Sequence, residues 1–372
     1  MTYIKLAEEA YAKRHERCRG LRARGGRFVG SMCTYVPEEL ILAAGATPVR
    51  VTPLLGGTPA ADTYLPANVC PAMKACLEAA LKGVYDYLDG VVFSNSCDNL
   101  GRIYDIWKLR GVGGRLFLFN TPHSKRATSV RRFVHEMRRL RSFLESLYGA
   151  AVDDAKVADA ASLMDRLRLA LKGLEALRKQ DPPLLTGVES FYAVAASMSL
   201  PKGEALELVE GILSEPPRER GELRGRPRVL VSGSYIDDEA RLLRMIEGAG
   251  ACVVADDTCT GSRYYDRLVG AARDIYEAIA TRYLEKVPCP FVEHYEDRLR
   301  AIMGAVRDFN VHGVVLWVVK FCDTHLFEAP HLIEELKAAG VPCIALEWSP
   351  AEVEWARLKT RVEAFVEALG GV

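Results

Sequence analysis

Short apolar runs alternate with longer amphipathic stretches along most of this chain. In its first part the apolar runs lie at residues 27–31, 47–51, 90–93 and 115–119. Helical spacing of apolar positions fits residues 37–44 and 71–81. Short apolar runs separated by helical stretches are typical of strand-helix-strand units in a parallel sheet. The pattern therefore predicts an α/β domain at the start of the chain.

The middle of the chain has a different pattern. Strand signals vanish between about residues 123 and 213, where charged helical sequence at 131–147 and 159–178 is interrupted by Asp181-Pro-Pro. This segment is predicted to be a helical insertion or connector. Residues 214–227 are rich in charge, Pro and Gly and have little to bury, so they are the best candidate for a linker.

The first pattern returns after the linker. Strand-like runs lie at 229–232, 251–255, 313–319 and 343–347, and a last helix is predicted from about residue 351 to 369. The 372 residues exceed what one core usually supports. We therefore predict an α/β fold with two doubly wound parallel sheets, in domains at 1–215 and 216–372. Residues 88–98 also resemble 311–323, which favours two related halves without proving a duplication.

Charge and hydropathy exclude several classes of partner. The sequence has 49 Lys and Arg against 49 Asp and Glu, without a long block of one sign, so neither nucleic acid nor an anionic membrane is expected as principal partner. It has no basic amino-terminal region followed by an apolar stretch, and no run of about 18 apolar residues. We expect a cytoplasmic protein without a membrane span.

Ten cysteines need another explanation than disulfides, because cytoplasmic conditions keep thiols reduced. Ligands of open parallel sheets collect beyond the carboxyl ends of the strands, and Cys97, Cys259 and Cys322 each follow a predicted strand. Cys70 precedes a helix that Pro71 can open. Free amides at a helix start lower thiol pKa values, so we expect thiolates that suit a soft metal.

Several cysteines are expected to be structural. Cys252 and Cys343 fall in apolar strands, Cys76 in an amphipathic helix and Cys18 in an arginine-rich one. Zinc is the competing metal, but no two cysteines stand closer than six residues apart, and structural zinc sites usually show tighter pairs. Widely spaced thiols fit an iron-sulfur cluster better. Three ligands would leave one iron open to substrate, whereas four would favour electron transfer alone.

Specific motifs carry a family resemblance. They are GSMCTYVPEELILAAGATPVR at 30–50, LPANVCP at 65–71, SCD at 96–98, DDTCTGSR at 256–263, KFCD at 320–323 and LKTRVEAFVE at 358–367. In this order they resemble the 2-hydroxyacyl-CoA dehydratase and benzoyl-CoA reductase family, in particular the 2-hydroxyglutaryl-CoA dehydratase D-component type. The resemblance runs from about residue 30 to 367 and is least distinctive in the helical middle.

The resemblance implies two flavodoxin-like domains with additional helices and a [4Fe-4S] cluster on the cysteines that match Cys70, Cys97 and Cys322. It also implies a CoA thioester substrate, a homodimer or a heterodimer with a similar subunit, and a separate ATP-hydrolysing iron-sulfur activator. The chain has no Gly-x4-Gly-Lys-Ser/Thr pattern, which agrees with ATP being handled elsewhere.

The implied chemistry explains the cluster. The β-hydrogen of a 2-hydroxyacyl thioester is hardly acidic, and general acid-base catalysis contributes only about 10²- to 10⁴-fold. In this family an added electron forms a ketyl radical anion that expels the hydroxyl group, so an oxygen-sensitive lyase is expected. A benzoyl-CoA reductase-like enzyme that reduces an aromatic ring is an alternative. A non-catalytic partner subunit that only relays electrons is an alternative of another class.

Three further cysteines leave the size of the cluster open. The family includes homodimeric reductases with a double-cubane cluster on six cysteines, and Cys33, Cys259 and Cys289 could complete such a set. Those proteins also have a cysteine in a Lys-Cys-Pro setting, where this chain reads KGVYDYLD at 82–89. Alternatively, Cys33 lines the substrate cleft near Tyr35 or packs in the core.

The remaining candidates have strong structural alternatives. Glu38 and Glu39 follow Pro37 at a predicted helix start, where a carboxylate commonly complements the helix dipole. Arg50, Arg263 and Lys320 could bind CoA phosphates or a thioester anion, with ion pairing as the equal alternative. No catalytic base can be named.

His325 stands three residues after Cys322 and could reach a cluster or a proton path, or could simply pack. The run Val231-Ser-Gly-Ser-Tyr lacks the full Gly-x-Gly-x-x-Gly spacing, so a dinucleotide site is not expected.

Overall fold

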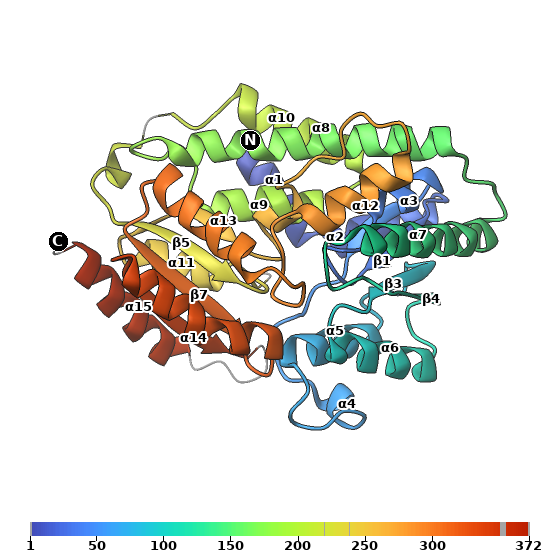
Figure 1. The fold of residues 1–372 in the computed structure, drawn as a ribbon, viewed down its shortest axis with the longest axis horizontal. Coiled ribbons are helices and arrows are strands. Elements are labelled where there is room, and N and C mark those ends of the chain that lie inside the picture. The colour runs from blue at the N-terminus through green and yellow to red at the C-terminus, as the bar shows by residue number, and fades with distance from the viewer. Residues whose placement is uncertain (1, 219, 238, 350–354, 371–372) are drawn as a thin grey trace.

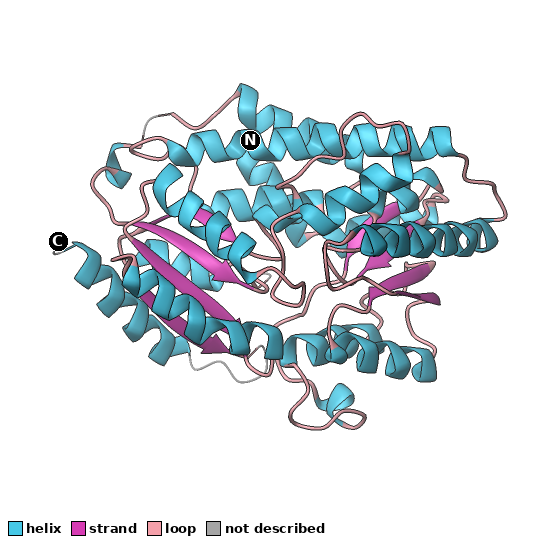
Figure 2. Ribbon diagram, viewed as in Figure 1, coloured by secondary structure: helices cyan, strands magenta, loops and turns pink. Residues whose placement is uncertain are grey.

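The computed structural model describes residues 2–218, 220–237, 239–349 and 355–370. Its two sheets each have four parallel strands (Figures 1 and 2). The first has the order β2-β1-β3-β4, with β1 Phe28–Ser31, β2 Thr47–Arg50, β3 Gly90–Ser94 and β4 Arg115–Phe119. The second has the order β6-β5-β7-β8, with β5 Arg228–Gly233, β6 Cys252–Asp257, β7 Gly313–Val319 and β8 Cys343–Trp348.

The predicted fold class is confirmed. In each sheet the strand order reverses beside the first strand, as it does in flavodoxin-like folds. All seven residues of β7 are buried, as expected for a parallel sheet covered on both faces. The two segments with similar sequence contain β3 and β7, which occupy equivalent positions in the two sheets.

Six helices accompany the first sheet: α1 Tyr3–Ala12, α2 Arg14–Ala23, α3 Glu38–Ala43, α4 Pro59–Asp62, α5 Pro71–Leu81 and α6 Asp98–Arg110. Their ends follow local chemistry. Pro71 occupies the first turn of α5, where its missing N–H costs nothing. Gly111 ends α6 at a φ of 62°, a left-handed conformation that favours glycine.

The helical middle is confirmed. It consists of α7 Ala127–Tyr148, α8 Asp154–Lys179, α9 Gly187–Ser197 and α10 Lys202–Ser214. The side chain of Asp153 caps α8 by accepting the backbone N–H of Lys156. Helix α8 runs along one side of the molecule past both sheets (Figure 1).

The last part contains α11 Arg241–Gly248, α12 Ile275–Glu285, α13 Tyr295–Asp308, α14 Asp323–Ala338 and α15 Trp355–Gly370, with short 3-10 helices at Gly221–Leu223 and Ser262–Tyr264. The predicted start of the last helix, near residue 351, lies outside the described residues.

The two halves exchange helices. Helices α8 and α9 precede the second sheet in sequence, yet both pack against β6. Helix α12 follows β6 and packs against α7, so that Ile279 and Tyr283 join Phe119 and Phe133 in a core beside the first sheet. One large core contains residues of both sheets, including Phe93 of β3 and Trp317 of β7. A domain boundary at residue 215 stays a prediction.

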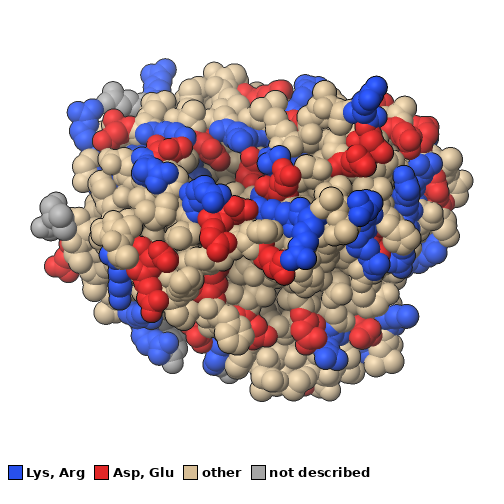
Figure 3. Space-filling model, in the orientation of Figure 1, with Lys and Arg blue, Asp and Glu red and all other residues tan. Residues whose placement is uncertain are grey.

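The face shown in Figure 3 carries Lys and Arg interspersed with Asp and Glu. This mixture agrees with the balanced charge of the sequence. No described helix is both long and apolar enough to span a bilayer.

Candidate functional site

Six cysteines line one cavity of about 390 Å³, which the ends of strands from both sheets surround. They are Cys33, Cys70, Cys97, Cys259, Cys289 and Cys322. Cys33 follows β1, Cys97 follows β3 and Cys322 follows β7. We call this space the cysteine cavity. It lies where the topology of two open parallel sheets places a ligand site.

The three predicted ligands have the same local structure. Cys70, Cys97 and Cys322 are the residues immediately before α5, α6 and α14. Each thiol accepts a backbone N–H from the first turn of its helix: Cys70 from Met73 and Ala72, Cys97 from Leu100 and Cys322 from His325. We call these cysteines the helix-cap trio. The amides provide electropositive partners that would stabilise a sulfur ligand with negative charge.

The expected lowering of the thiol pKa values is wrong for the protein without a metal. Burial raises the pKa of Cys70 to about 12, and the neighbouring Cys322 raises it further. Burial also raises the pKa of Cys97 and of Cys322. Desolvation penalises the charged thiolate by more than the helix amides stabilise it. Cys259 does not start a regular helix, since it lies in a turn before the short 3-10 helix at Ser262–Tyr264, and its pKa is likewise raised by burial.

The other three thiols form a second trio, Cys33, Cys259 and Cys289. Cys289 lies in the loop between α12 and α13, and its backbone N–H donates to the Tyr35 hydroxyl at 3.2 Å. Burial raises its pKa to about 11, with further contributions from Cys259 and Cys33 that oppose the effect of Arg263. Ser96, next to Cys97, donates to Cys33 Sγ at 3.4 Å and so links the two trios.

The cavity fits a group larger than one ion. Among the described residues, no three His, Cys, Asp or Glu side chains are close enough together to hold a single metal ion. The volume of about 390 Å³ is more than ten times the roughly 30 Å³ of one water molecule. Thiolate sulfur is the usual protein ligand of iron-sulfur clusters. The donor type, the spacing and the space therefore all fit such a cluster.

His325 also lines the cavity. Its side chain is buried, and burial lowers its pKa well below the usual value, with Arg298 and Arg263 acting in the same direction. The Nε2 atom has no hydrogen-bond partner among the described residues. A neutral imidazole with a free nitrogen can therefore face a bound group.

Two lining residues were missed by the sequence reasoning. His123 follows β4 and Tyr235 follows β5, and both lie on the cavity wall. The rule that selected the cysteines, position just beyond a strand, applies to both. At the level of the sequence this rule was not applied to His123 or Tyr235. The His123 ring contacts Phe291 edge-on, at 5.2 Å between ring centres.

The four cysteines expected to be structural lie away from this cavity's lining. Cys18 and Cys76 are buried within α2 and α5, Cys252 begins β6 and Cys343 begins β8. Their positions in core elements agree with the roles expected for them.

The carboxylates at the start of α3 belong to a buried ionic network. Glu38 lies 3.2 Å from Lys202 and 3.6 Å from Arg50, and it accepts from the Tyr264 hydroxyl at 2.9 Å. Lys202 and Arg50 hold the pKa of Glu38 below its usual value against the effect of burial. Glu39 forms a separate pair with Arg168, at 2.6 Å. None of these groups is among the residues that line the cysteine cavity.

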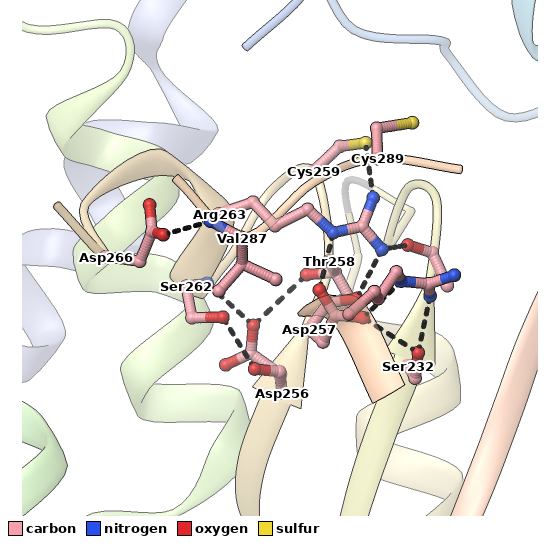
Figure 4. A network of polar contacts seen from close by, with 12 residues as sticks. Ser232, Asp256, Asp257, Thr258, Cys259, Ser262, Arg263, Asp266, Val287 and Cys289 are labelled. Atoms are coloured by element: carbon pink, nitrogen blue, oxygen red, sulfur yellow. Dashed lines mark hydrogen bonds and ion pairs between the residues drawn. The ribbon is translucent and has the colours of Figure 1, made fainter. Parts of the chain in front are cut away.

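Arg263 is paired as well. Its Nε donates to Asp257 at 2.6 Å, and its Nη1 lies 3.7 Å from Cys259 Sγ, as Figure 4 shows. Lys320 is only partly buried, beside the ring of Phe321. Ion pairing thus describes Arg50 and Arg263 better than the phosphate contacts considered from sequence.

A second cavity, of about 520 Å³, adjoins the first. The two share Cys289, Pro290, Phe291 and Thr324 in their linings. The second cavity is bounded by α13, α14 and the loop between α12 and α13, and it contacts Phe327, whose side chain is largely exposed. These shared residues form a common wall between the two cavities.

Comparisons with known proteins match nearly the whole chain. The sequence model of the family described as 2-hydroxyglutaryl-CoA dehydratase, D-component, matches residues 33–369. The chain is 25% identical over 346 residues to the (R)-phenyllactyl-CoA dehydratase beta subunit of Clostridium sporogenes, covering 93% of this chain and 92% of that one. It is 30% identical over 361 residues to the putative dehydratase subunit YjiM of Escherichia coli K12, covering 94% and 93%.

A third relative is named as a subunit of a reductase. The chain is 23% identical over 353 residues to a benzoyl-CoA reductase subunit of Thauera aromatica, covering 92% of this chain and 91% of that one. The family match at residues 33–369 spans β2 to β8 and the helical middle.

Proposed function

Because the chain belongs to the 2-hydroxyglutaryl-CoA dehydratase D-component family, we propose that it is the iron-sulfur subunit of a 2-hydroxyacyl-CoA dehydratase. Its relatives are dehydratase subunits and a reductase subunit, so the chain is an enzyme component. In our proposal Cys70, Cys97 and Cys322 hold one [4Fe-4S] cluster. The observation that carries the proposal is that these thiols, from helix starts beside both sheets, line the same cavity.

Three protein ligands would leave one iron open to a substrate oxygen. When bound, the cluster supplies a low-potential electron for a ketyl radical anion at the thioester carbonyl, which expels the 2-hydroxyl group. The protein's own contribution is to exclude water and to position the thioester. Buried apolar residues such as Met32, Met73 and Val319 line the cavity, and His325 offers a neutral nitrogen for a hydrogen bond.

The partners belong to the same proposal. The names of the relatives describe subunits, which supports an assembly with a similar chain, either a homodimer or a heterodimer. We also propose a separate ATP-hydrolysing iron-sulfur activator as electron donor. All ten cysteines are free, which supports a reducing compartment such as the cytoplasm. An oxygen-sensitive protein follows from a cluster with an open iron.

A second candidate function has its own support. All six cysteines of the two trios line the cysteine cavity, which supports a double-cubane cluster and a reductase of small molecules. Against it stands the sequence KGVYDYLD at 82–89, which has no cysteine in the Lys-Cys-Pro setting of the double-cubane proteins. A benzoyl-CoA reductase-like activity would use the single cluster of the helix-cap trio with an aromatic substrate. A partner subunit that only relays electrons would hold a cluster without turning over a thioester.

The experiment is anaerobic purification with iron and acid-labile sulfide counted per chain. About four of each supports the single cluster, and about eight of each supports the double one. Zinc in place of iron would contradict both. Cys97→Ser should reduce the iron content strongly, whereas Cys343→Ser, away from the cavity, should leave it unchanged.

A further inference from the structure

The two trios lie in different electrostatic surroundings. Arg263 and Lys286 stand behind the second trio, and both side chains are almost wholly buried. Arg263 Nη1 approaches Cys259 Sγ at 3.7 Å, with Cys289 beside it in Figure 4. Lys286 Nζ bonds to Thr34 Oγ1 at 3.0 Å and to the Arg263 carbonyl at 3.3 Å. Two cations thus reach the second trio from the protein interior.

The buried cations on this side are only partly matched by directly paired carboxylates. Arg263 and Arg298 share the carboxylate of Asp257, and Arg298 also pairs with Glu328, which makes two cations and two anions. Lys286 forms no ion pair within 4 Å among the described residues, and the Asp266 carboxylate acts on it from farther away. Burial lowers the pKa of Lys286 to about 8, so the ammonium keeps its proton at neutral pH. Lys286 is therefore a charged group near the second trio that no described carboxylate contacts directly.

The helix-cap trio has different neighbours. Among the described residues, no Lys or Arg forms a hydrogen bond with a sulfur atom of this trio, and the residues that follow Cys97 and Cys322 are Asp98 and Asp323, which both line the cavity. At the second trio, in contrast, Arg263 Nη1 reaches Cys259 Sγ. Lys286 Nζ lies 4.2 Å from the centre of the Tyr35 ring, whose hydroxyl accepts the backbone N–H of Cys289. The cavity therefore has a cationic end and a weakly anionic end.

We propose that Cys33, Cys259 and Cys289 hold a second iron-sulfur cluster that accepts an electron more readily than the cluster at Cys70, Cys97 and Cys322, because Arg263 and Lys286 stabilise its added negative charge. The inference rests on the second candidate function, and it assigns Arg263 and Lys286 as positioning residues. A unit positive charge several Å from a redox group favours the reduced form by about tenfold or more. Each step adds one electron from an external reductant and breaks no bond.

The difference between the two reduction potentials sets the order in which the two clusters are reduced. An electron that enters settles first at the second trio. The helix-cap trio, whose cluster has the lower potential, is then reduced second and is the stronger reductant toward a substrate. The adjoining cavity shares Cys289 in its lining, so the second trio is the one that borders this cavity.

The test is a redox titration of the anaerobically purified holoprotein with titanium(III) citrate, followed by electron paramagnetic resonance. Two reduction steps are expected. Lys286→Met removes the Lys286 charge and also relieves a costly burial, so it should fold. At the wild-type midpoint of the more positive step, the ratio of reduced to oxidised cluster should fall about tenfold, which corresponds to about 59 mV for one electron. The more negative step should move less.

Controls separate charge from structure. Lys286→Arg retains the charge and should retain the wild-type potentials, and Lys5→Met removes an exposed charge on α1 and should have no effect. Cys289→Ser should remove the more positive step. Unchanged potentials in Lys286→Met, or equal shifts of both steps, would contradict the inference. About four irons per wild-type chain would also overturn it while leaving the single-cluster dehydratase standing, and a protein without iron would remove both.

Discussion

At the scale of single residues, the Glu38 carboxylate tests how much the buried ion pairs near the site contribute to stability. It lies fully buried between Lys202 and Arg50, both of which are also buried. In Glu38→Gln those two cations would stay buried without a carboxylate between them. Breaking a buried ion pair in this way typically costs about 3–5 kcal/mol. We expect a loss of that order in the free energy of unfolding, measured by urea denaturation.

The control is Glu204→Gln, which removes an exposed carboxylate paired with Arg17 and should change stability by less than about 1 kcal/mol. Adding Lys202→Met to Glu38→Gln should recover part of the loss, because one unpaired charge is removed with it. Equal losses for Glu38→Gln and Glu204→Gln would show that the buried pairing contributes nothing.

The sequence predicted the position of the site residues correctly, but it did not predict the direction of their pKa shifts. The position of Cys97 and Cys322 beyond strands follows from local apolar patterns, which the sequence displays directly. The direction of their pKa shifts depends on burial, which many distant segments create together. The inclusion of Cys289 in the cavity depends on a loop whose backbone is bound by Tyr35, 254 residues away. A contact over that distance leaves no local signal.

At the scale of elements, α11 caps α9 through one side chain. Glu247 of α11 accepts the backbone N–H of Gly187, the first residue of α9, at 2.6 Å. Burial raises the pKa of Glu247 to about 7, and Glu189 adds to the rise. A carboxyl group whose folded pKa is raised stabilises the fold fully below its unfolded pKa of about 4.5, and this stability is lost as pH rises through 7.

Glu247→Gln keeps an acceptor for Gly187 but cannot ionise. We expect it to be more stable than the wild type at pH 8 by about 2 kcal/mol, and to show little of this gain at pH 5. Urea denaturation at the two pH values measures the difference. Glu207→Gln, on the exposed face of α10, should show no such pH dependence. A gain of Glu247→Gln that is the same at both pH values would contradict the role of ionisation.

The end of β5 tolerates no side chain at Gly233. A Cβ there would collide with the backbone carbonyl of Trp317 in β7, and the Gly233 carbonyl accepts from Arg263 Nη2. Gly233→Ala should therefore destabilise the fold by about 3 kcal/mol, since strand pairing has to shift. Gly304→Ala in α13 meets no heavy atom within 4 Å and should stabilise by about 0.5–1 kcal/mol. Thermal unfolding compares the two, and similar effects would contradict the packing at β5.

The sequence predicted the bounds of single helices and strands more completely than the contacts between them. The strand at 313–319 and the helix at 71–81 have the bounds that the sequence predicts, because apolar periodicity is a local property. The sequence could not show that α8 and α9 cover β6, or that α12 joins the first half. Which faces of amphipathic helices meet depends on long-range packing that periodicity does not encode.

At the scale of the whole molecule, the exchange of helices predicts joint unfolding of the two halves. Without α8 and α9, residues 216–372 would lose the helices that pack against β6 in the intact chain. We expect the isolated fragment 216–372 to bind a hydrophobic dye and to lack a cooperative urea transition, whereas the intact chain unfolds in one transition. A fragment with its own sharp transition would instead support an independent carboxyl-terminal domain.

The central claim is that Cys70, Cys97 and Cys322 together hold iron. The most direct measurement is anomalous diffraction at the iron absorption edge from crystals grown without oxygen. We predict an anomalous peak in the cysteine cavity, with iron about 2.3 Å from each of the three sulfur atoms, as metal-thiolate bonds require. Iron bound elsewhere, or a cavity in which those three sulfurs contact no iron, would contradict the claim.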